Sequence, residues 1–132
     1  MIYSRNSGNP DKIFLTEAGN GAEGVKTVYA DSSMQADAED MTPSELFQAA
    51  LACCTNMTLS GVLHKRGIPF DDIEVDVRME QVDGKTVLTR SVKVTSDAPA
   101  EQVEAAIERA KTSFMTKVLT GEIEVRDESA QE

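Results

Sequence analysis

Two adjacent cysteines, Cys53 and Cys54, are the residues of this chain best suited to covalent chemistry. Neighbouring side chains on a helix point about 100° apart, which opposes a disulfide between them, so both are expected as free thiols of a reducing compartment. A thiol attacks only as a thiolate, which burial disfavours and a nearby cation favours. On residue types alone, either cysteine is more often a small core side chain than a nucleophile.

The side chains that could activate Cys54 are few. His64 follows ten residues later on the same predicted helix. That spacing is roughly 15 Å along the axis, so a cysteine–histidine pair within the helix is excluded. Arg90 falls on the apolar face of a later predicted strand. We favour the interpretation that an edge position or a bulge turns Arg90 outward over the interpretation that it is a buried functional cation. With one histidine and no paired cysteine motif, no metal or other cofactor is predicted.

The cysteines lie in the stretch with the clearest helix signals, residues 43–66. Thr42 and Glu45 form a capping-box pair at its start, and Gly67 suits its end. Apolar residues cover every direction around the axis, whereas a surface helix shows one apolar stripe. The helix is therefore expected to be buried on all sides. Its length of roughly 36 Å exceeds the expected width of one chain, so a partner subunit is expected to supply part of the cover.

The remainder of the chain predicts several strands and one further helix. The segment 32–41 is expected to be a loop, and an amphipathic helix is expected from Pro99 through Phe114. This order predicts a single domain, residues 1–132, of the α+β class, with an antiparallel sheet packed on helices. The predicted strands cover residues 1–5, 12–16 and 24–31, residues 73–80 and 86–96 joined by a turn at Asp83-Gly84, and residues 123–125.

The charge of the chain limits its partners. The formal net charge is -10, with 23 acidic against 13 basic residues, which argues against nucleic-acid or anionic-membrane binding. No run of about 18 consecutive apolar residues and no signal-peptide pattern occur in the sequence. We therefore expect a cytoplasmic location and neither a nucleic-acid nor a membrane partner.

The segment TPSELFQAALACCTNMTLSGVLHKRG, followed by IPFDDIEVDVRME, resembles the core motif of the OsmC/Ohr family. That motif has a proline, an acidic residue, a leucine, a run of small and apolar residues, and then a cysteine before a Met/Thr/Leu stretch. The similarity extends through AAIERAKTSFMTKVL and GEIEV, so it covers about residues 25–126. It implies an OsmC-like fold in which two chains form an intertwined homodimer, with the long helices central and the sheets wrapped round them.

The resemblance also implies a chemistry. Characterised members of the family reduce organic hydroperoxides: a helix thiolate attacks the O–O bond, becomes a sulfenic acid and is resolved by a second cysteine on the following helix. Cys54 matches the attacking thiol. The candidate cation beside that thiolate is Arg5 or Arg90, and Glu45 is a candidate orienting group.

The family's second cysteine is replaced here by Ser113, and a serine cannot form a disulfide. The resemblance thus implies hydroperoxide reduction of a one-cysteine type, as part of an oxidative stress response, with an external thiol as reductant. The alternative is a non-catalytic dimer that binds a small apolar ligand or acts as a thiol redox sensor.

Overall fold

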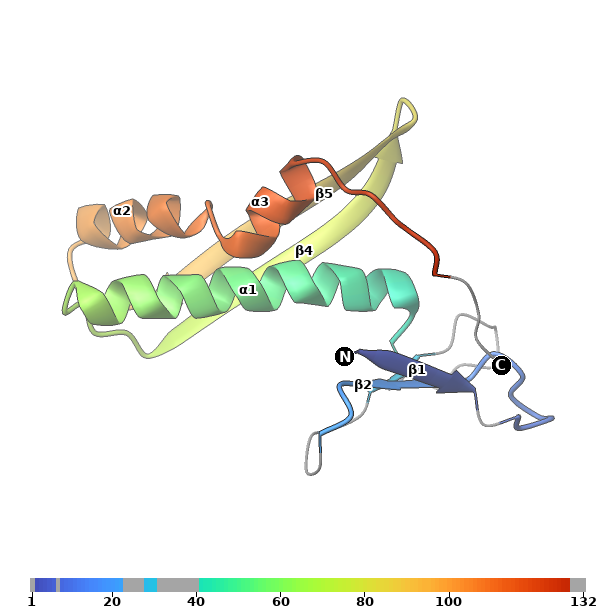
Figure 1. The fold of residues 1–132 in the computed structure, drawn as a ribbon. Coiled ribbons are helices and arrows are strands. Elements are labelled where there is room, and N and C mark those ends of the chain that lie inside the picture. Colours follow the sequence, from blue (N-terminus) through green and yellow to red (C-terminus); the bar gives the residue numbers. More distant parts are fainter. Residues whose placement is uncertain (1, 7, 23–27, 31–40, 129–132) are drawn as a thin grey trace. The chain divides into compact units, whose positions relative to one another are not determined.

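A computed structural model describes residues 2–6, 8–22, 28–30 and 41–128 (Figure 1). The chain divides into two compact units, Met1–Phe47 and Gln48–Glu132. Nearly all of the loop expected over residues 32–41 lies outside the described residues, as do the first residues of the strand expected over 24–31.

The first unit contains an antiparallel sheet of three short strands in the order β1-β2-β3. The strands are β1 (Tyr3–Asn6), β2 (Thr16–Gly19) and β3 (Val28–Ala30). The strand expected over residues 12–16 is wrong, because this stretch forms turns and β2 begins only at its last residue. The Asn9 side chain accepts the amide of Asp11, and the Asn6 side chain donates to the carbonyl of Ile13. These local bonds hold the backbone in turns and leave it unpaired with a neighbouring strand.

The long helix α1 (Pro43–Lys65) begins and ends as its sequence predicts. The Thr42 amide donates to the Glu45 carboxylate at 3.0 Å, and the Glu45 amide donates to the Thr42 hydroxyl at 3.2 Å. This reciprocal pair is the capping box. At the other end Gly67 has φ of 66°, its amide donates to the His64 carbonyl, and the amide of Ile68 donates to the Leu63 carbonyl. These two bonds form the Schellman motif that closes a helix.

The second unit contains a long hairpin with helices packed on it. Strands β4 (Asp72–Val82) and β5 (Lys85–Thr95) pair antiparallel along their whole length, and Asp83 and Gly84 turn between them with φ of 52° and 75°. Helices α2 (Ala100–Ala110) and α3 (Phe114–Thr120) follow (Figure 1). The core lies where α1 and α2 meet the hairpin, and its fully buried members are Leu59, Leu63, Ala106 and Ala110.

Two expectations about the end of the chain are wrong. The helix expected from Pro99 through Phe114 ends at Ala110, and a separate helix begins after Ser113. Ser113 has an extended backbone and its hydroxyl accepts the amide of Thr116, so it caps a new helix and interrupts the old one. No strand forms over 123–125: among the described residues this segment has no pairing partner, and Val125 is 85% exposed.

Burial of α1 within the single chain is one-sided. Its buried residues follow a spacing of four: Leu51, Thr55, Leu59 and Leu63. Met57 is 75% exposed, so the burial expected on all sides is not found within one chain.

By length and composition α1 is also the one helix of the described residues that could cross a bilayer. Core helices of soluble proteins share this property.

The capping box predicts a pH dependence of stability. Hydrogen bonds from Thr42 lower the pKa of the Glu45 carboxyl below its usual value. A carboxyl whose pKa is lowered in the folded state stabilises the fold above its ordinary pKa, and this contribution is lost as pH falls through the folded value. Glu45→Gln keeps the acceptor but removes the titration. Its melting temperature should therefore fall less than that of wild type between about pH 6 and pH 3.

The matched control is Glu74→Gln, since Glu74 is exposed on β4 and its side chain makes no hydrogen bond within the described residues. Thermal melts followed by circular dichroism over this pH range measure the effect. An acid dependence of Glu45→Gln as steep as that of Glu74→Gln would contradict the role given to the Glu45 charge.

Candidate functional site

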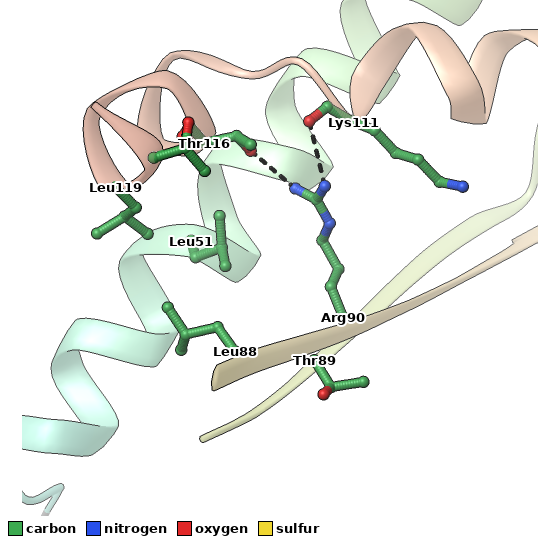
Figure 2. A pocket seen from close by; sticks show the side chains of 8 residues that line it. Leu51, Leu88, Thr89, Arg90, Lys111, Thr116 and Leu119 are labelled. Atoms are coloured by element: carbon green, nitrogen blue, oxygen red, sulfur yellow. Dashed lines mark hydrogen bonds between the residues drawn. The ribbon is translucent and has the colours of Figure 1, made fainter. Parts of the chain in front are cut away.

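Arg90 points from β5 into the space between the hairpin and the helices. Its Nη1 donates to Thr55 Oγ1 on α1 at 2.9 Å. Figure 2 shows the other two bonds, from Nη1 to Thr116 Oγ1 on α3 at 3.0 Å and from Nη2 to the carbonyl oxygen of Lys111 at 3.1 Å. The outward turn expected for Arg90 is therefore wrong. The β4–β5 register runs one to one past Arg90 and Val77, so no bulge redirects the side chain.

A chain of hydroxyl groups continues from this guanidinium into the protein. Thr55 is fully buried and its Oγ1 also donates to the Leu51 carbonyl at 2.8 Å. On the other side Thr116 Oγ1 lies 2.9 Å from the hydroxyl of Ser113, which is itself buried. A buried hydroxyl without a partner would cost free energy, and each of these has one. Ser113 thus belongs to the hydrogen-bonded network of Arg90.

The Arg90 charge has no carboxylate partner among the described residues. The three oxygens that accept from it are all neutral. The Lys111 ammonium is paired with Glu108 at 2.6 Å. A guanidinium has five N–H groups. Within the described part of the chain three are used, and the Nε–H and one Nη2–H have no acceptor.

A pocket of about 350 Å³ opens beside this guanidinium. In Figure 2 three leucines from three different elements gather on one side of it and the Arg90 guanidinium lies on the other. The pocket is therefore amphipathic, with an apolar part and one cationic group. Its lining consists of Leu51 from α1, Leu88, Thr89 and Arg90 from β5, Lys111, and Thr116, Leu119 and Thr120 from α3.

The two cysteines differ in exposure. Both are free thiols; Cys53 is exposed and Cys54 is half-buried. Within the described residues the Cys54 sulfur makes no hydrogen bond, and the hydrogen bonds of Arg90 go to Thr55, Thr116 and Lys111. The structure thus joins Arg90 to Thr55, the residue after Cys54, and forms no hydrogen bond between the arginine and the thiol.

The other predicted site residues belong to the first unit. Arg5 lies on β1, where its guanidinium carbon is 5.7 Å from the centroid of the Tyr3 ring, a cation–π contact. Glu45 is engaged in the capping box. Their proposed roles beside Cys54 stay predictions. Across the described residues no group of three or more His, Cys, Asp or Glu side chains is placed to hold a metal ion.

Thr55 and Thr116 are the site residues that sequence reasoning missed. A usable signal existed for Thr55, because it interrupts the series Leu51, Leu59 and Leu63, which shares one face of the helix at a spacing of four. A polar residue in such a series requires a buried partner. Arg90, in an apolar series of its own strand, could have been matched to it.

The sequence model of the OsmC-like protein family matches residues 36–127. The chain belongs to the OsmC-like family. The match covers α1 with both cysteines, the hairpin with Arg90, and the two later helices of this OsmC-like chain. No curated protein sequence matches it significantly.

Solved structures share the fold of the OsmC-like chain at low sequence identity. An OsmC-like protein from Mycoplasma pneumoniae is 16% identical, with a TM-score of 0.72 over 92% of this chain and 86% of the other. The organic hydroperoxide resistance protein OhrB of Bacillus subtilis is 20% identical, with a TM-score of 0.61 over 92% and 90% of the two chains. An organic hydroperoxide resistance protein OsmC from Legionella pneumophila is 16% identical, with a TM-score of 0.58 over 92% and 88%. The α+β, OsmC-like fold expected from the sequence is confirmed.

The hydroxyl network predicts a stability difference between two threonines of α3 in this OsmC-like chain. Thr116→Val removes a hydroxyl that accepts from Arg90 and meets Ser113, and it leaves their polar groups without that partner. The free energy of unfolding should fall by about 1–3 kcal/mol.

Thr120→Val is the matched control, because its hydroxyl donates only to the Thr116 carbonyl on the same exposed turn. Its expected change is within about 0.5 kcal/mol. Denaturant unfolding of both variants measures the comparison. Equal losses in the two variants would show that the network contributes nothing specific.

Proposed function

We propose that this OsmC-like chain reduces organic hydroperoxides through Cys54 and an external thiol. The observation that carries the proposal is the state of Cys54: a free, half-buried thiol on α1, within the part of the chain that matches the family. Structures of the same fold include proteins named for organic hydroperoxide resistance. Their names support the reaction class proposed for this chain.

The proposed reaction has two stages. The Cys54 thiolate attacks one oxygen of the hydroperoxide, the O–O bond breaks, and the alkoxide leaves as an alcohol after taking a proton from solvent. Cys54 is oxidised to a sulfenic acid. A thiol reductant then attacks the sulfenic sulfur and water leaves, which gives a mixed disulfide. A second thiol molecule releases the Cys54 thiol and carries away the disulfide of the reductant.

The need for an external reductant follows from the neighbours of Cys54. Ser113 is engaged in the Arg90 network and has no sulfur. Cys53 is adjacent on a continuous helix, where the two side chains diverge. Free cysteines are typical of a reducing compartment such as the cytoplasm. A cytoplasmic location would supply low-molecular-weight thiols as the reductant.

The cation that stabilises the thiolate is proposed to be Arg5 or Arg90, with Glu45 as an orienting group. Three N–H groups of Arg90 are already bound to neutral oxygens, whereas Arg5 is exposed and contacts the Tyr3 ring. Arg5 is therefore the freer of the two guanidinium groups. Glu45 would have to give up its bonds to Thr42 to reorient.

A second function is favoured by a separate observation. The pocket beside Arg90 is amphipathic and has the volume of a small-ligand site, and Cys54 is not among its lining residues. The chain could therefore bind a small ligand without thiol chemistry, with the cysteines as packing groups or as a redox sensor. The behaviour of Cys54→Ser separates this function from peroxide reduction.

We also propose a homodimer built on the exposed side of α1. Ala50, Cys53, Met57 and Gly61 recur at spacings of three and four, opposite the buried series that begins at Leu51. They form a stripe of small and apolar side chains on the solvent side of the single chain. A second copy would bury this stripe and complete the all-round burial that the sequence of α1 predicts.

The enzyme proposal predicts different behaviour for the two thiols. With a thiol reductant present, wild type and Cys53→Ser should both consume cumene hydroperoxide. Cys54→Ser should lose at least about 100-fold in rate, because the attacking sulfur is removed. Consumption of the peroxide measures the rate, and dimedone labelling followed by mass spectrometry locates the sulfenic acid. Equal rates for wild type and Cys54→Ser would sink the proposal.

The dimer proposal predicts that a charge on the stripe separates the subunits. Wild type should scatter light as a particle of about twice the chain mass of 14.3 kDa at micromolar concentration. Met57→Lys should shift the equilibrium toward the monomer, because it buries an unpaired charge in the interface. Gln102→Lys, on the exposed face of α2, makes the same charge change away from the stripe and should stay dimeric. A stable wild-type monomer would contradict the dimer.

A further inference from the structure

We propose that the pocket beside Arg90 binds a small amphipathic carboxylate. The carboxylate of such a ligand would accept from the Arg90 guanidinium, and its hydrocarbon tail would lie against the leucines of the pocket. This inference names a ligand class for the second candidate function, which is the binding of a small ligand without thiol chemistry. It does not depend on peroxide reduction by Cys54.

The first argument is the unpaired charge of Arg90. Among the described residues, the acceptors of the half-buried Arg90 side chain are the neutral oxygens of Thr55, Thr116 and Lys111. A cation withdrawn from water is compensated best by an anion, and no carboxylate of the described residues supplies one. Within the part of the chain that the structure describes, the Nε–H and the second Nη2–H have no acceptor. A carboxylate with two oxygens suits such a pair of donors better than a hydroxyl does.

The second argument is rigidity. The three oxygens that hold Arg90 come from α1, α3 and the end of α2, so the guanidinium is fixed before any ligand arrives. Thr55 is in turn fixed by its bond to the Leu51 carbonyl. A donor group that is already oriented loses less conformational entropy on binding. The arrangement is that of a built anion site, whereas a surface arginine would be mobile.

The third argument is the apolar part of the pocket. Leu51, Leu88 and Leu119 face the cavity from three elements, so a hydrocarbon chain that leaves the carboxylate would contact apolar surface. The volume of about 350 Å³ lies in the range of small-ligand sites. An inorganic anion would leave this apolar part unused, which favours a ligand with both a carboxylate and a tail.

A second cationic groove of the same unit serves as the comparison. It contains Lys65, Arg66 and Arg109, and its other lining residues are Thr58, Gly61 and Val62. The valine is its one branched apolar side chain. Lys65 and Arg66 also suit the negative end of the α1 dipole, so their presence needs no ligand. The groove lacks the apolar part that the Arg90 pocket has, and it provides the control residue for the test.

The test compares three eight-carbon probes on the full wild-type chain by isothermal titration calorimetry. Octanoate, octanol and octylammonium have nearly the same tail and carry an anionic, a neutral and a cationic head group. Octanoate should bind at one site per chain, at least about tenfold more tightly than octanol, because the head group forms charge-assisted hydrogen bonds. Octylammonium should bind more weakly still. Equal affinities for octanoate and octanol, or no saturable octanoate binding, would overturn the proposal.

Variants then locate the site. Arg90→Met should remove the preference for octanoate over octanol, while Arg109→Met, which removes the same charge from the other groove, should keep it. The reverse pattern would overturn the assignment to Arg90. If Arg90→Met does not fold, Leu119→Trp takes its place, since a larger side chain in the apolar part should weaken octanoate and octanol binding alike by tenfold or more. Unchanged affinities in Leu119→Trp would equally overturn the assignment.

Cys54→Ser separates this inference from the proposed enzyme. The variant should bind octanoate with wild-type affinity, because Cys54 is not among the residues that line the pocket. Loss of peroxide reduction with octanoate binding intact would support both proposals. Peroxide reduction by a wild-type chain that fails to prefer octanoate would remove the ligand class and leave the enzyme standing.

Discussion

The Arg90 guanidinium joins the hairpin of the second unit to all three of its helical segments. Arg90 leaves β5 and reaches oxygens on α1, on α3 and at the end of α2. Without those acceptors the charge would have to return to water, and the space it fills would open between the elements. The buried hydroxyls of Thr55 and Ser113 are tolerated for the same reason, since each is part of the hydrogen-bonded group that Arg90 completes.

The same packing gives α1 one covered side and one exposed side. The hairpin and α2 cover one side through Leu59 and Leu63, and the opposite side carries small and apolar residues that the rest of the described second unit does not cover. A helix this apolar is seldom stable with half of its circumference in water. Cover from outside the chain would account for the composition of α1, and the homodimer proposed above would supply that cover.

The sequence predicted best the features that depend on neighbours in the chain. The capping box of Thr42 and Glu45, the glycine end at Gly67 and the Asp83-Gly84 turn are local, and all form as expected. The failures depend on pairing. Residues 123–125 alternate as a strand does, yet no partner strand lies beside them among the described residues. An alternating pattern indicates which side chains would share one face of a strand. It does not indicate whether a second strand is present to pair with it.

The inward position of Arg90 was missed for a related reason. In its own strand Arg90 stands among apolar residues. Considered alone, such an arginine keeps its charge in water at the lowest free-energy cost by turning outward. The acceptors that reverse this preference come from residues 35 and 26 positions away, Thr55 and Thr116. The break before α3 belongs to the same network, because Ser113 both caps that helix and meets Thr116. Thr116 is thus common to the long-range bond of Arg90 and to the local cap of α3.

The register of α1 also gives the two thiols different exposure to solvent. The bond from Arg90 fixes Thr55 on the buried side of the helix. Successive residues are rotated by about 100°, so Cys54 is carried to the edge of that side and Cys53 to the open side. A half-buried thiol can meet a small molecule while excluding bulk solvent, whereas an exposed one lies in the proposed contact between subunits. The difference in exposure between Cys53 and Cys54 therefore follows from their positions around α1 relative to the buried Thr55.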